Sequence, residues 1–305
     1  MIPRGELSRE HDRLRVTPRS PARAALVTLR PRQWVKNLLL FGGIIFAAEV
    51  DDPGKWLQAF AAFAAYCAAS SAAYVVNDLR DVEADREHPV KRNRPIARGE
   101  LHGHVAVVLA AALLAVAFGL AAWLGFESVL CLLCFTALQT AYSLGLKNVV
   151  LVDVLAIAAL FVIRAAAGAI AVDVRISPWL LICTGLLALF LALGKRRAEL
   201  SLVAAEQTPG RRVLAGYSAL FLDRMLVVVA GATTAAYVLY SLTARDSYGL
   251  VITAPFVIFG LGRYLHLVRE SDMGEEPENV LLGDTPILLT VAVWAVVCAV
   301  ILVEG

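Results

Sequence analysis

Apolar residues are gathered in long runs along the whole chain, and short polar stretches separate these runs. Runs of roughly 15–25 apolar residues have the length that a helix needs to cross a bilayer. Nine such runs are found, at 36–50, 56–76, 104–124, 128–146, 149–172, 177–194, 220–242, 248–268 and 286–303. The first is short, and the fifth contains a basic residue, Arg164. The pattern predicts an all-α polytopic membrane protein with nine transmembrane helices.

The composition agrees with a membrane protein. The 305 residues are 59% hydrophobic and 18% charged, and the mean hydropathy is +0.69. These values overrule the two soluble domains that the length alone suggests. We expect one transmembrane domain over residues 25–305. Residues 1–24 are rich in Arg and Pro and are expected to form a disordered basic cytoplasmic tail on anionic lipid.

The distribution of positive charge orients the chain. The net charge of +2 is small, but with nine spans all but four of the 28 Lys and Arg residues fall on one side. The exceptions are Lys55, Arg175, Arg245 and the intramembrane Arg164. The positive-inside rule therefore predicts a multi-pass protein of the plasma (inner) membrane with a cytoplasmic N-terminus. The long loops, 77–103, 195–219 and 269–285, share that side, so we also expect the active site to face the cytoplasm.

An acidic segment follows the second apolar run and reads NDLRDVEADREHPVKRNRP over residues 77–95. If the helix continues past Val76, then Asn77, Asp81 and Asp85 lie on one face, and Asp78 joins them there. Neighbouring carboxylates raise one another's pKa unless a cation lies among them. Oxygen ligands suit Mg²⁺. We predict a magnesium site in which Asp78, Asp81 and Asp85 are catalytic and Asn77 is a further ligand.

Basic residues follow this acidic segment directly. Lys91 and Arg94 belong to a cluster whose side chains suit phosphate oxygens. Acidic residues that suit a metal ion, followed directly by basic residues that suit phosphate, predict a magnesium-diphosphate site. The alternative is a solvated helix end, where charged residues only mark the boundary with water.

The segment resembles the first aspartate-rich motif of the UbiA-type membrane transferase superfamily, NDxxDxxxD followed by K-x-x-R-P. The resemblance covers essentially the whole chain beyond the tail. It implies nine transmembrane helices around a central, cytoplasm-facing pocket with Mg²⁺ and a diphosphate. One departure is GKRRAEL at 194–200, where the aromatic prenyltransferases of the superfamily carry a second motif, DxxxD. Lys195 and Glu199 stand at its acidic positions.

Basic residues in place of a second metal motif favour a substrate with more anionic groups than one diphosphate. Anchoring under the positive-inside rule remains the alternative reading of GKRRAEL. Arg164, unpaired in mid-membrane, would cost about 2.5–3.5 kcal/mol, so it should face a polar cavity or an acid. The predicted substrate-binding residues are Lys36, Asn37, Lys91, Arg94, Tyr142, Lys147, Arg164, Lys195, Arg196, Arg197 and Glu199.

The stretches RPRQWVKN, YSLGLKN and GKRRAEL resemble one branch of that superfamily. This branch transfers 5-phosphoribose from phosphoribosyl pyrophosphate to a polyprenyl (decaprenyl) phosphate and releases pyrophosphate, a step in arabinan cell-wall precursor synthesis. The resemblance implies Mg²⁺, these two substrates and membrane phospholipids, with no nucleic acid, and it leaves homo-oligomerisation open. Two alternatives are prenyl transfer to an aromatic acceptor, which the missing second motif disfavours, and a transporter, which should show internal repeats.

Overall fold

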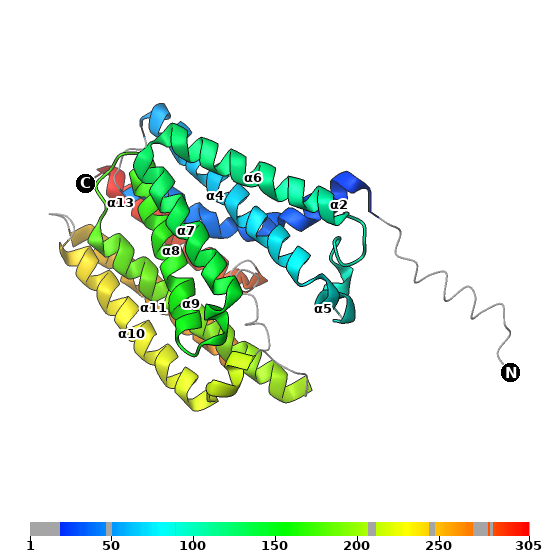
Figure 1. Ribbon diagram of the computed structural model, residues 1–305. Helices are drawn as coiled ribbons and strands as arrows, with labels where there is room; N and C mark the ends of the chain where they lie inside the picture. Colours follow the sequence, from blue (N-terminus) through cyan, green and yellow to red (C-terminus); the bar gives the residue numbers. More distant parts are fainter. Residues whose placement is uncertain are drawn as a thin grey trace, which may run out of the picture. The chain divides into compact units, whose positions relative to one another are not determined.

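The computed structural model describes residues 19–46, 51–88, 90–206, 212–243, 248–270, 280 and 283–304. Within these ranges the regular secondary structure is helical throughout (Figure 1). The helices form two compact units. Unit 1 consists of Met1–Gln33 and Ala69–Ala115, and unit 2 consists of Trp34–Ala68 and Val116–Gly305. Helices α4 (Pro53–Arg80) and α6 (Gly103–Leu124) each contribute residues to both units.

Seven helices in the described ranges are long and apolar enough to cross a membrane. They are Pro53–Arg80, Gly103–Leu124, Phe126–Leu144, Val152–Ala171, Pro178–Val203, Ala219–Thr243 and Gly249–Arg269. A further apolar helix, Thr285–Ile301, is shorter. The prediction of an all-α chain with repeated apolar spans is confirmed, whereas the count of nine stays a prediction.

The first predicted span, 36–50, is not one continuous α-helix. Pro31–Phe41 forms a 3₁₀ helix, η1, and only Gly42–Phe46 follows it as a short helix, α3; the last four residues of the predicted span lie outside the described part. A Cβ at Gly43 would lie 2.7 Å from the Cα of Ala169 in α8 (Val152–Ala171). The segment therefore packs backbone against backbone, which small residues allow in membrane proteins.

Unit 1 begins with α2, Pro21–Leu29. Its N-cap is Ser20, whose hydroxyl oxygen accepts a hydrogen bond from the Arg23 N–H at 3.4 Å, and Pro21 stands at the first helical position. The hydroxyl of Ser71 in α4 donates to the Leu29 carbonyl at 2.9 Å and fastens the end of α2. The helix and its cap thus begin before residue 24, the predicted end of the tail.

The rest of unit 1 is the connection from α4 to α6. It contains α5 (Val82–Glu87) and a short 3₁₀ helix, η2 (Lys91–Asn93). Val75 of α4, Ile96 and Leu101 of the connection, and Ala106 of α6 form a buried apolar cluster. This cluster holds the backbone of the connection against the two long helices.

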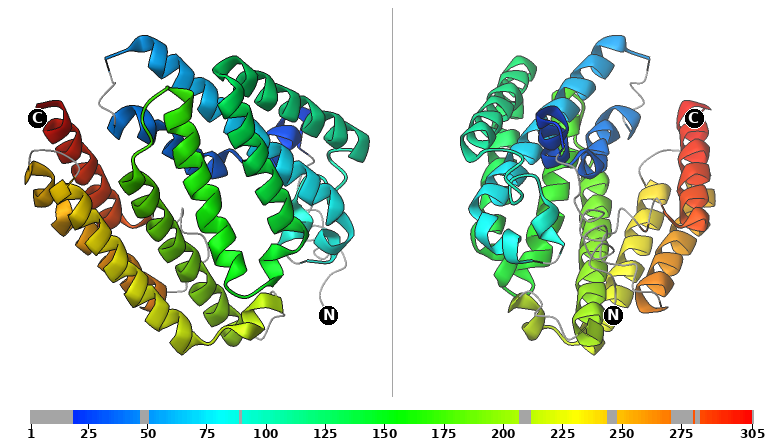
Figure 2. Two further views of the ribbon diagram at one scale, coloured as in Figure 1. Left: turned by 60° about the vertical axis from the view of Figure 1, so that its left-hand side comes forward. Right: turned by 90° about the vertical axis from the view of Figure 1, so that its right-hand side faces the viewer.

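Unit 2 is a bundle built from α7 (Phe126–Leu144), α8 (Val152–Ala171), α9 (Pro178–Glu206), α10 (Ala219–Thr243), α11 (Ala254–Glu270) and α13 (Thr285–Glu304). Helices α9, α10 and α11 lie side by side (Figure 2). Val154, Phe190, Leu222, Tyr264 and Ile287 belong to one core that joins five of these helices. The core thus joins α8 and α9 to α10, α11 and α13.

Large apolar side chains remain exposed along the long helices. Examples are Val108 and Trp123 of α6, Val228 of α10 and Val296 of α13. Exposed apolar surface on this scale is unusual for a soluble monomer and is what a helix presents to lipid.

Candidate functional site

The acidic segment keeps its helical hydrogen bonds past the end of α4. The Asp81 N–H donates to the Asn77 carbonyl at 2.9 Å, and the Asp85 N–H donates to the Asp81 carbonyl at 2.8 Å. Asp81 itself has φ −94° and ψ 12°, and α5 begins at the next residue. The predicted register through Asp85 is therefore retained, with a local irregularity at Asp81.

Two of the three predicted carboxylates meet at one arginine. The Nη1 atom of Arg94 donates to Asp78 Oδ1 at 3.1 Å and to Asp85 Oδ2 at 2.6 Å. Both aspartates are buried. Asp81 does not join them: its carboxylate is 41% exposed and accepts a hydrogen bond from Arg80 Nε at 3.1 Å. Asn77 is half-buried in the last turn of α4.

Arg30 is a second cation on the carboxylate of Asp78, and it is not among the residues predicted from the sequence. Its Nη2 donates to Asp78 Oδ1 at 2.6 Å, and its guanidinium lies 4.7 Å from the centroid of the Tyr74 ring. Arg30 ends α2 in the left-handed conformation, with φ 53°, which is rare for a residue with a Cβ. The ion pair with Asp78 and the stacking on Tyr74 hold its side chain in place.

A cavity of about 340 Å³ opens at this cluster, a size within the usual range for small-molecule sites. Its lining combines acid, base and apolar residues, namely Val27, Arg30, Asp78, Val90, Lys91, Asn93, Arg94 and Pro95. The predicted phosphate-binding residues Lys91 and Arg94 thus share one cavity with the predicted metal ligand Asp78. Such a lining suits an anion that arrives together with a divalent cation.

The donor set at the cavity fits such a cation in its chemistry. Asp78 and Asp85 offer oxygen atoms only, and their carboxylates already share one positively charged atom, Arg94 Nη1. Oxygen ligands are those that Mg²⁺ prefers. No group of three or more His, Cys, Asp or Glu side chains within the described ranges is placed to hold a metal ion. The two carboxylates therefore provide a partial site, to which other oxygen ligands would have to be added.

A second polar cluster lies in unit 2 around Arg196, which is fully buried. Arg196 donates from Nε to Asp153 Oδ2 at 2.5 Å, from Nη1 to Glu199 Oε2 at 2.5 Å and from Nη2 to the Tyr142 hydroxyl at 3.2 Å. All three guanidinium nitrogens are thus engaged by the protein. The structure brings the predicted residues Tyr142, Arg196 and Glu199 together, from α7 and α9.

Asp153 completes this cluster and was missed in the sequence. It is fully buried in the first turn of α8, and the Tyr217 hydroxyl donates to its Oδ1 at 2.6 Å. The same hydroxyl accepts a hydrogen bond from the Leu151 N–H at 2.8 Å. Burial raises the pKa of Tyr217, and the hydrogen bond to Asp153 raises this pKa further. The available signal was a single acid inside the apolar stretch LVDVL, which needs a buried partner.

Arg164 and Asn37, both predicted to bind substrate, are also neighbours in unit 2. Arg164 Nε donates to Asn37 Oδ1 at 2.8 Å, and Nη1 donates to the Leu160 carbonyl at 3.1 Å. The guanidinium lies 4.6 Å and 5.3 Å from the ring centroids of Phe135 and Phe161. An amide oxygen, a carbonyl and two aromatic faces therefore stabilise this buried charge.

The other predicted residues of unit 2 are half-buried. Arg197 Nε donates to Asp223 Oδ1 at 3.0 Å, and Nη1 bonds the hydroxyl of Ser201. Lys36, Lys147 and Lys195 are half-buried.

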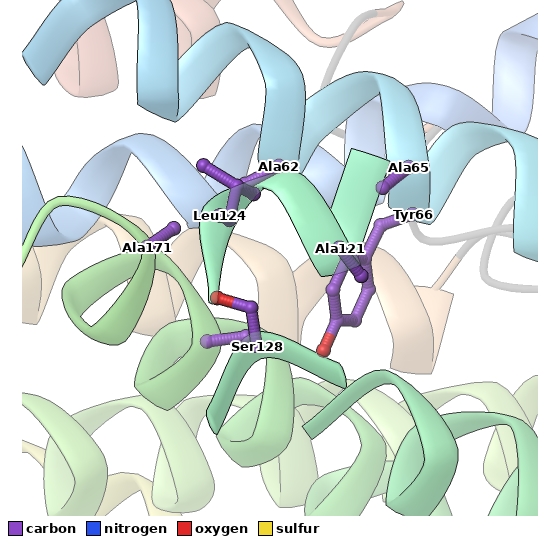
Figure 3. A pocket seen from close by; sticks show the side chains of 8 residues that line it. Ala62, Ala65, Tyr66, Ala121, Leu124, Ser128 and Ala171 are labelled. Carbon is purple, nitrogen blue, oxygen red and sulfur yellow. The ribbon is translucent and has the colours of Figure 1, made fainter. Parts of the chain in front are cut away.

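A small cavity in unit 2 is shown in Figure 3. Its volume is about 10 Å³, and its lining consists of Ala62, Ala65, Tyr66, Ala121, Leu124, Ser128, Ala167 and Ala171. The hydroxyls of Tyr66 and Ser128 are buried, and neither has a hydrogen-bond partner within the described ranges. The space is about that of one water molecule, so this cavity cannot hold a substrate.

Comparisons with known proteins bear on these sites. The family model described as the UbiA prenyltransferase family matches residues 38–283. A decaprenyl-phosphate phosphoribosyltransferase of Mycolicibacterium smegmatis is 33% identical over 293 residues, which are 91% of this chain and 92% of that protein. The protein with the same description from Mycobacterium tuberculosis is 35% identical over 277 residues, with 87% and 90% covered.

Among solved structures, a UbiA homolog from Archaeoglobus fulgidus has a similar fold. The TM-score is 0.70 at 17% identity, and the match covers 92% of this chain and all of that one. The family predicted from the acidic motif is therefore confirmed, and the apolar helices are those of a multi-pass membrane protein. The chain belongs to the UbiA prenyltransferase family.

Proposed function

We propose that the protein transfers 5-phosphoribose from phosphoribosyl pyrophosphate to a polyprenyl phosphate such as decaprenyl phosphate and releases pyrophosphate. The observation that carries the proposal is the cavity in unit 1, which is lined by Asp78 and by the basic residues Arg30, Lys91 and Arg94. Arg94 also binds the carboxylate of Asp85. The choice of substrates is supported by the relatives described as decaprenyl-phosphate phosphoribosyltransferases, which this chain matches over most of their length.

Mg²⁺ is the proposed cofactor. The Archaeoglobus fulgidus homolog was solved with GPP and Mg²⁺, and the oxygen donors of this chain suit the same ion. Asp78 and Asp85 would hold it, together with Asn77 and Asp81 of the same segment. When bound, a divalent cation neutralises the charge of a departing pyrophosphate.

The basic residues of unit 1 act on the leaving group. Arg30, Lys91 and Arg94 bind the phosphate oxygens of the donor and stabilise the negative charge that develops on them. The bond between the anomeric carbon and the pyrophosphate oxygen breaks with its electron pair on that oxygen. An oxygen of the lipid phosphate forms the new bond to the carbon. This oxygen is already ionised near pH 7, so the step needs positioning and no general base.

In unit 2, Arg196 is proposed to be a positioning residue. Its nitrogens donate to Asp153, Glu199 and Tyr142. Arg196 therefore holds the side chains of Glu199 and Tyr142 in place. Substrate binding stays the proposed role of Tyr142 and Glu199, and of Lys36, Asn37, Lys147, Arg164, Lys195 and Arg197.

The placement in the cell is part of the proposal. Nine transmembrane helices in the plasma membrane are proposed, and with that number the asymmetry of Lys and Arg supports a cytoplasmic N-terminus and a cytoplasmic active site.

The test is lipid labelling by purified protein in membranes. Phosphoribosyl pyrophosphate labelled in the ribose and decaprenyl phosphate are supplied with Mg²⁺, and the lipid phase is extracted. We expect label in the lipid, and far less of it when Asp85→Asn replaces the wild type. A parallel incubation supplies a labelled prenyl diphosphate and an aromatic acceptor. Label in the aromatic product alone would overturn the phosphoribosyl assignment.

A further inference from the structure

At the cavity of unit 1, two aspartates pair with two arginines, and three of these four residues, Asp78, Arg30 and Arg94, line the cavity. Arg30 Nη2 and Arg94 Nη1 both donate to the same oxygen, Asp78 Oδ1, at 2.6 Å and 3.1 Å. Arg94 Nη1 also donates to Asp85 Oδ2 at 2.6 Å. Counted together, these four side chains carry no net charge. The position between the two carboxylates is thus held by a cation that belongs to the protein.

The two aspartates are more deeply buried than the two arginines. The side chains of Asp78 and Asp85 are 2% and 4% exposed, whereas those of Arg30 and Arg94 are 29% and 28% exposed. Both guanidiniums line the cavity of about 340 Å³. The acids are therefore fixed inside the fold, and the arginine side chains have open space beside them.

The backbone that carries Arg94 is anchored by contacts of its own, which do not involve the Arg94 side chain. The Arg94 N–H donates to the Lys91 carbonyl at 2.9 Å, and the Arg98 N–H donates to the Arg94 carbonyl at 3.0 Å. Ile96 is buried in the apolar cluster of unit 1. A change of side-chain rotamer at Arg94 therefore needs no movement of the chain.

Binding of a divalent cation alone is unfavourable at this site. To bind between Asp78 and Asp85 it must displace Arg94, which then loses its charge-assisted hydrogen bonds to both carboxylates. A diphosphate removes that cost, because its oxygens accept the displaced N–H groups. The four side chains are neutral together, so a divalent cation alone would add two uncompensated positive charges. The negative charge of a diphosphate offsets them.

We propose that Arg94 is an exchangeable counter-ion: it joins Asp78 to Asp85 in the ligand-free protein and passes to phosphate oxygens when metal and diphosphate bind together. The site then takes up a metal–diphosphate complex and resists metal alone. This inference rests on the proposed function only as far as that function requires a metal–diphosphate complex in this cavity.

Two binding experiments on purified protein in detergent test the exchange, with Mn²⁺ as a spectroscopic probe. The first titrates Mn²⁺ without any anion and follows the free ion by electron paramagnetic resonance. The second titrates pyrophosphate at a fixed excess of Mn²⁺ and measures binding of the complex by calorimetry. We expect Arg94→Gln to bind Mn²⁺ alone about tenfold tighter than wild type, and the Mn²⁺–pyrophosphate complex about tenfold weaker, within the usual range of coupling between sites.

Two further variants test whether the changes in affinity come from the positive charge of Arg94 itself. Arg98→Gln removes a positive charge from the same connection, but Arg98 pairs with Glu100, so both affinities should equal those of wild type. Arg94→Lys keeps the charge, and its affinity for Mn²⁺ alone should stay weak, close to the wild-type value. Both variants and Arg94→Gln are compared by thermal melting, so that loss of folding is recognised.

In Arg94→Gln the affinity for Mn²⁺ alone should rise while the affinity for the Mn²⁺–pyrophosphate complex falls. These opposite changes identify the exchange, because simple damage to the site would weaken both affinities. If both affinities of Arg94→Gln change in the same direction, or if its affinity for Mn²⁺ alone equals that of wild type, the exchange is overturned. The proposed function is not affected by either result. Failure of the wild type to bind the Mn²⁺–pyrophosphate complex would instead overturn the proposed function.

Discussion

The guanidinium of Arg196 donates to the carboxylate of Asp153 at 2.5 Å, and neither side chain is exposed. The two residues are 43 positions apart and join α9 to the first turn of α8. A buried ion pair is stable only when its remaining hydrogen-bonding groups are satisfied. Glu199, Tyr142 and Tyr217 supply those partners here.

Loss of Asp153 is expected to destabilise the protein strongly. Asp153→Ala leaves a buried guanidinium with one of its acids removed, and breaking a buried pair in this way costs about 3–5 kcal/mol. Asp223→Ala is the matched control, because Asp223 pairs with the half-buried Arg197, and more exposed pairs contribute about 0–1 kcal/mol. Thermal melting in detergent should show a much lower midpoint for Asp153→Ala alone. Equal midpoints for the two variants would contradict the structural importance of this pair.

The aspartates of the acidic segment are expected to differ in their effect on turnover. Asp85→Asn should lower kcat by about 100-fold or more, or about 2.7 kcal/mol, because Asp85 is buried and faces the same cation as Asp78. Asp81→Asn should lower kcat less, since the Asp81 carboxylate is partly exposed and pairs with Arg80. The lipid-labelling assay with varied Mg²⁺ measures both. A larger loss with Asp81→Asn would show that the active arrangement differs from the one described.

Lys195 and Arg196 are adjacent in sequence but are expected to act differently. Lys195→Ala should raise the KM for phosphoribosyl pyrophosphate by about tenfold or more, since a hydrogen bond to a charged group contributes about 1.5–3 kcal/mol. Its melting midpoint should stay close to that of wild type. Lys55→Ala is the control, because Lys55 is predicted on the opposite face of the membrane. Unchanged kinetics in Lys195→Ala would indicate that this lysine only anchors α9.

Alkaline pH should test the hydrogen bond between Tyr217 and Asp153. The pKa of Tyr217 is raised in the folded protein because the hydroxyl is buried and donates to Asp153. The stabilisation is therefore fully present below the ordinary pKa of tyrosine, about 10, and is lost as the pH rises above it. We expect the melting midpoint of wild type to fall more steeply above pH 10 than that of Tyr217→Phe. Parallel curves would mean that this hydrogen bond does not control the alkaline transition.

Local features of the fold could be predicted from the sequence. The apolar runs indicated most of the long helices within a few residues, and the spacing of Asn77, Asp81 and Asp85 predicted the helical register that the backbone hydrogen bonds retain. Both depend on periodicity along one helix, which neighbouring residues determine. The form of the segment before α4 was not foreseen. An apolar run does not show that Gly43 lies against Ala169, which is distant in the sequence.

The sequence by itself determined the membrane class, the family resemblance and the presence of acidic and basic residues beside one helix end. Only the tertiary structure decided which of them meet: Arg30 reaches Asp78 across 48 positions, Asp81 turns to Arg80, and Asp153 receives Arg196. The reason is physical. Helix formation follows from local hydrogen bonds and apolar spacing, whereas the partner of a buried charge is chosen by how distant helices pack.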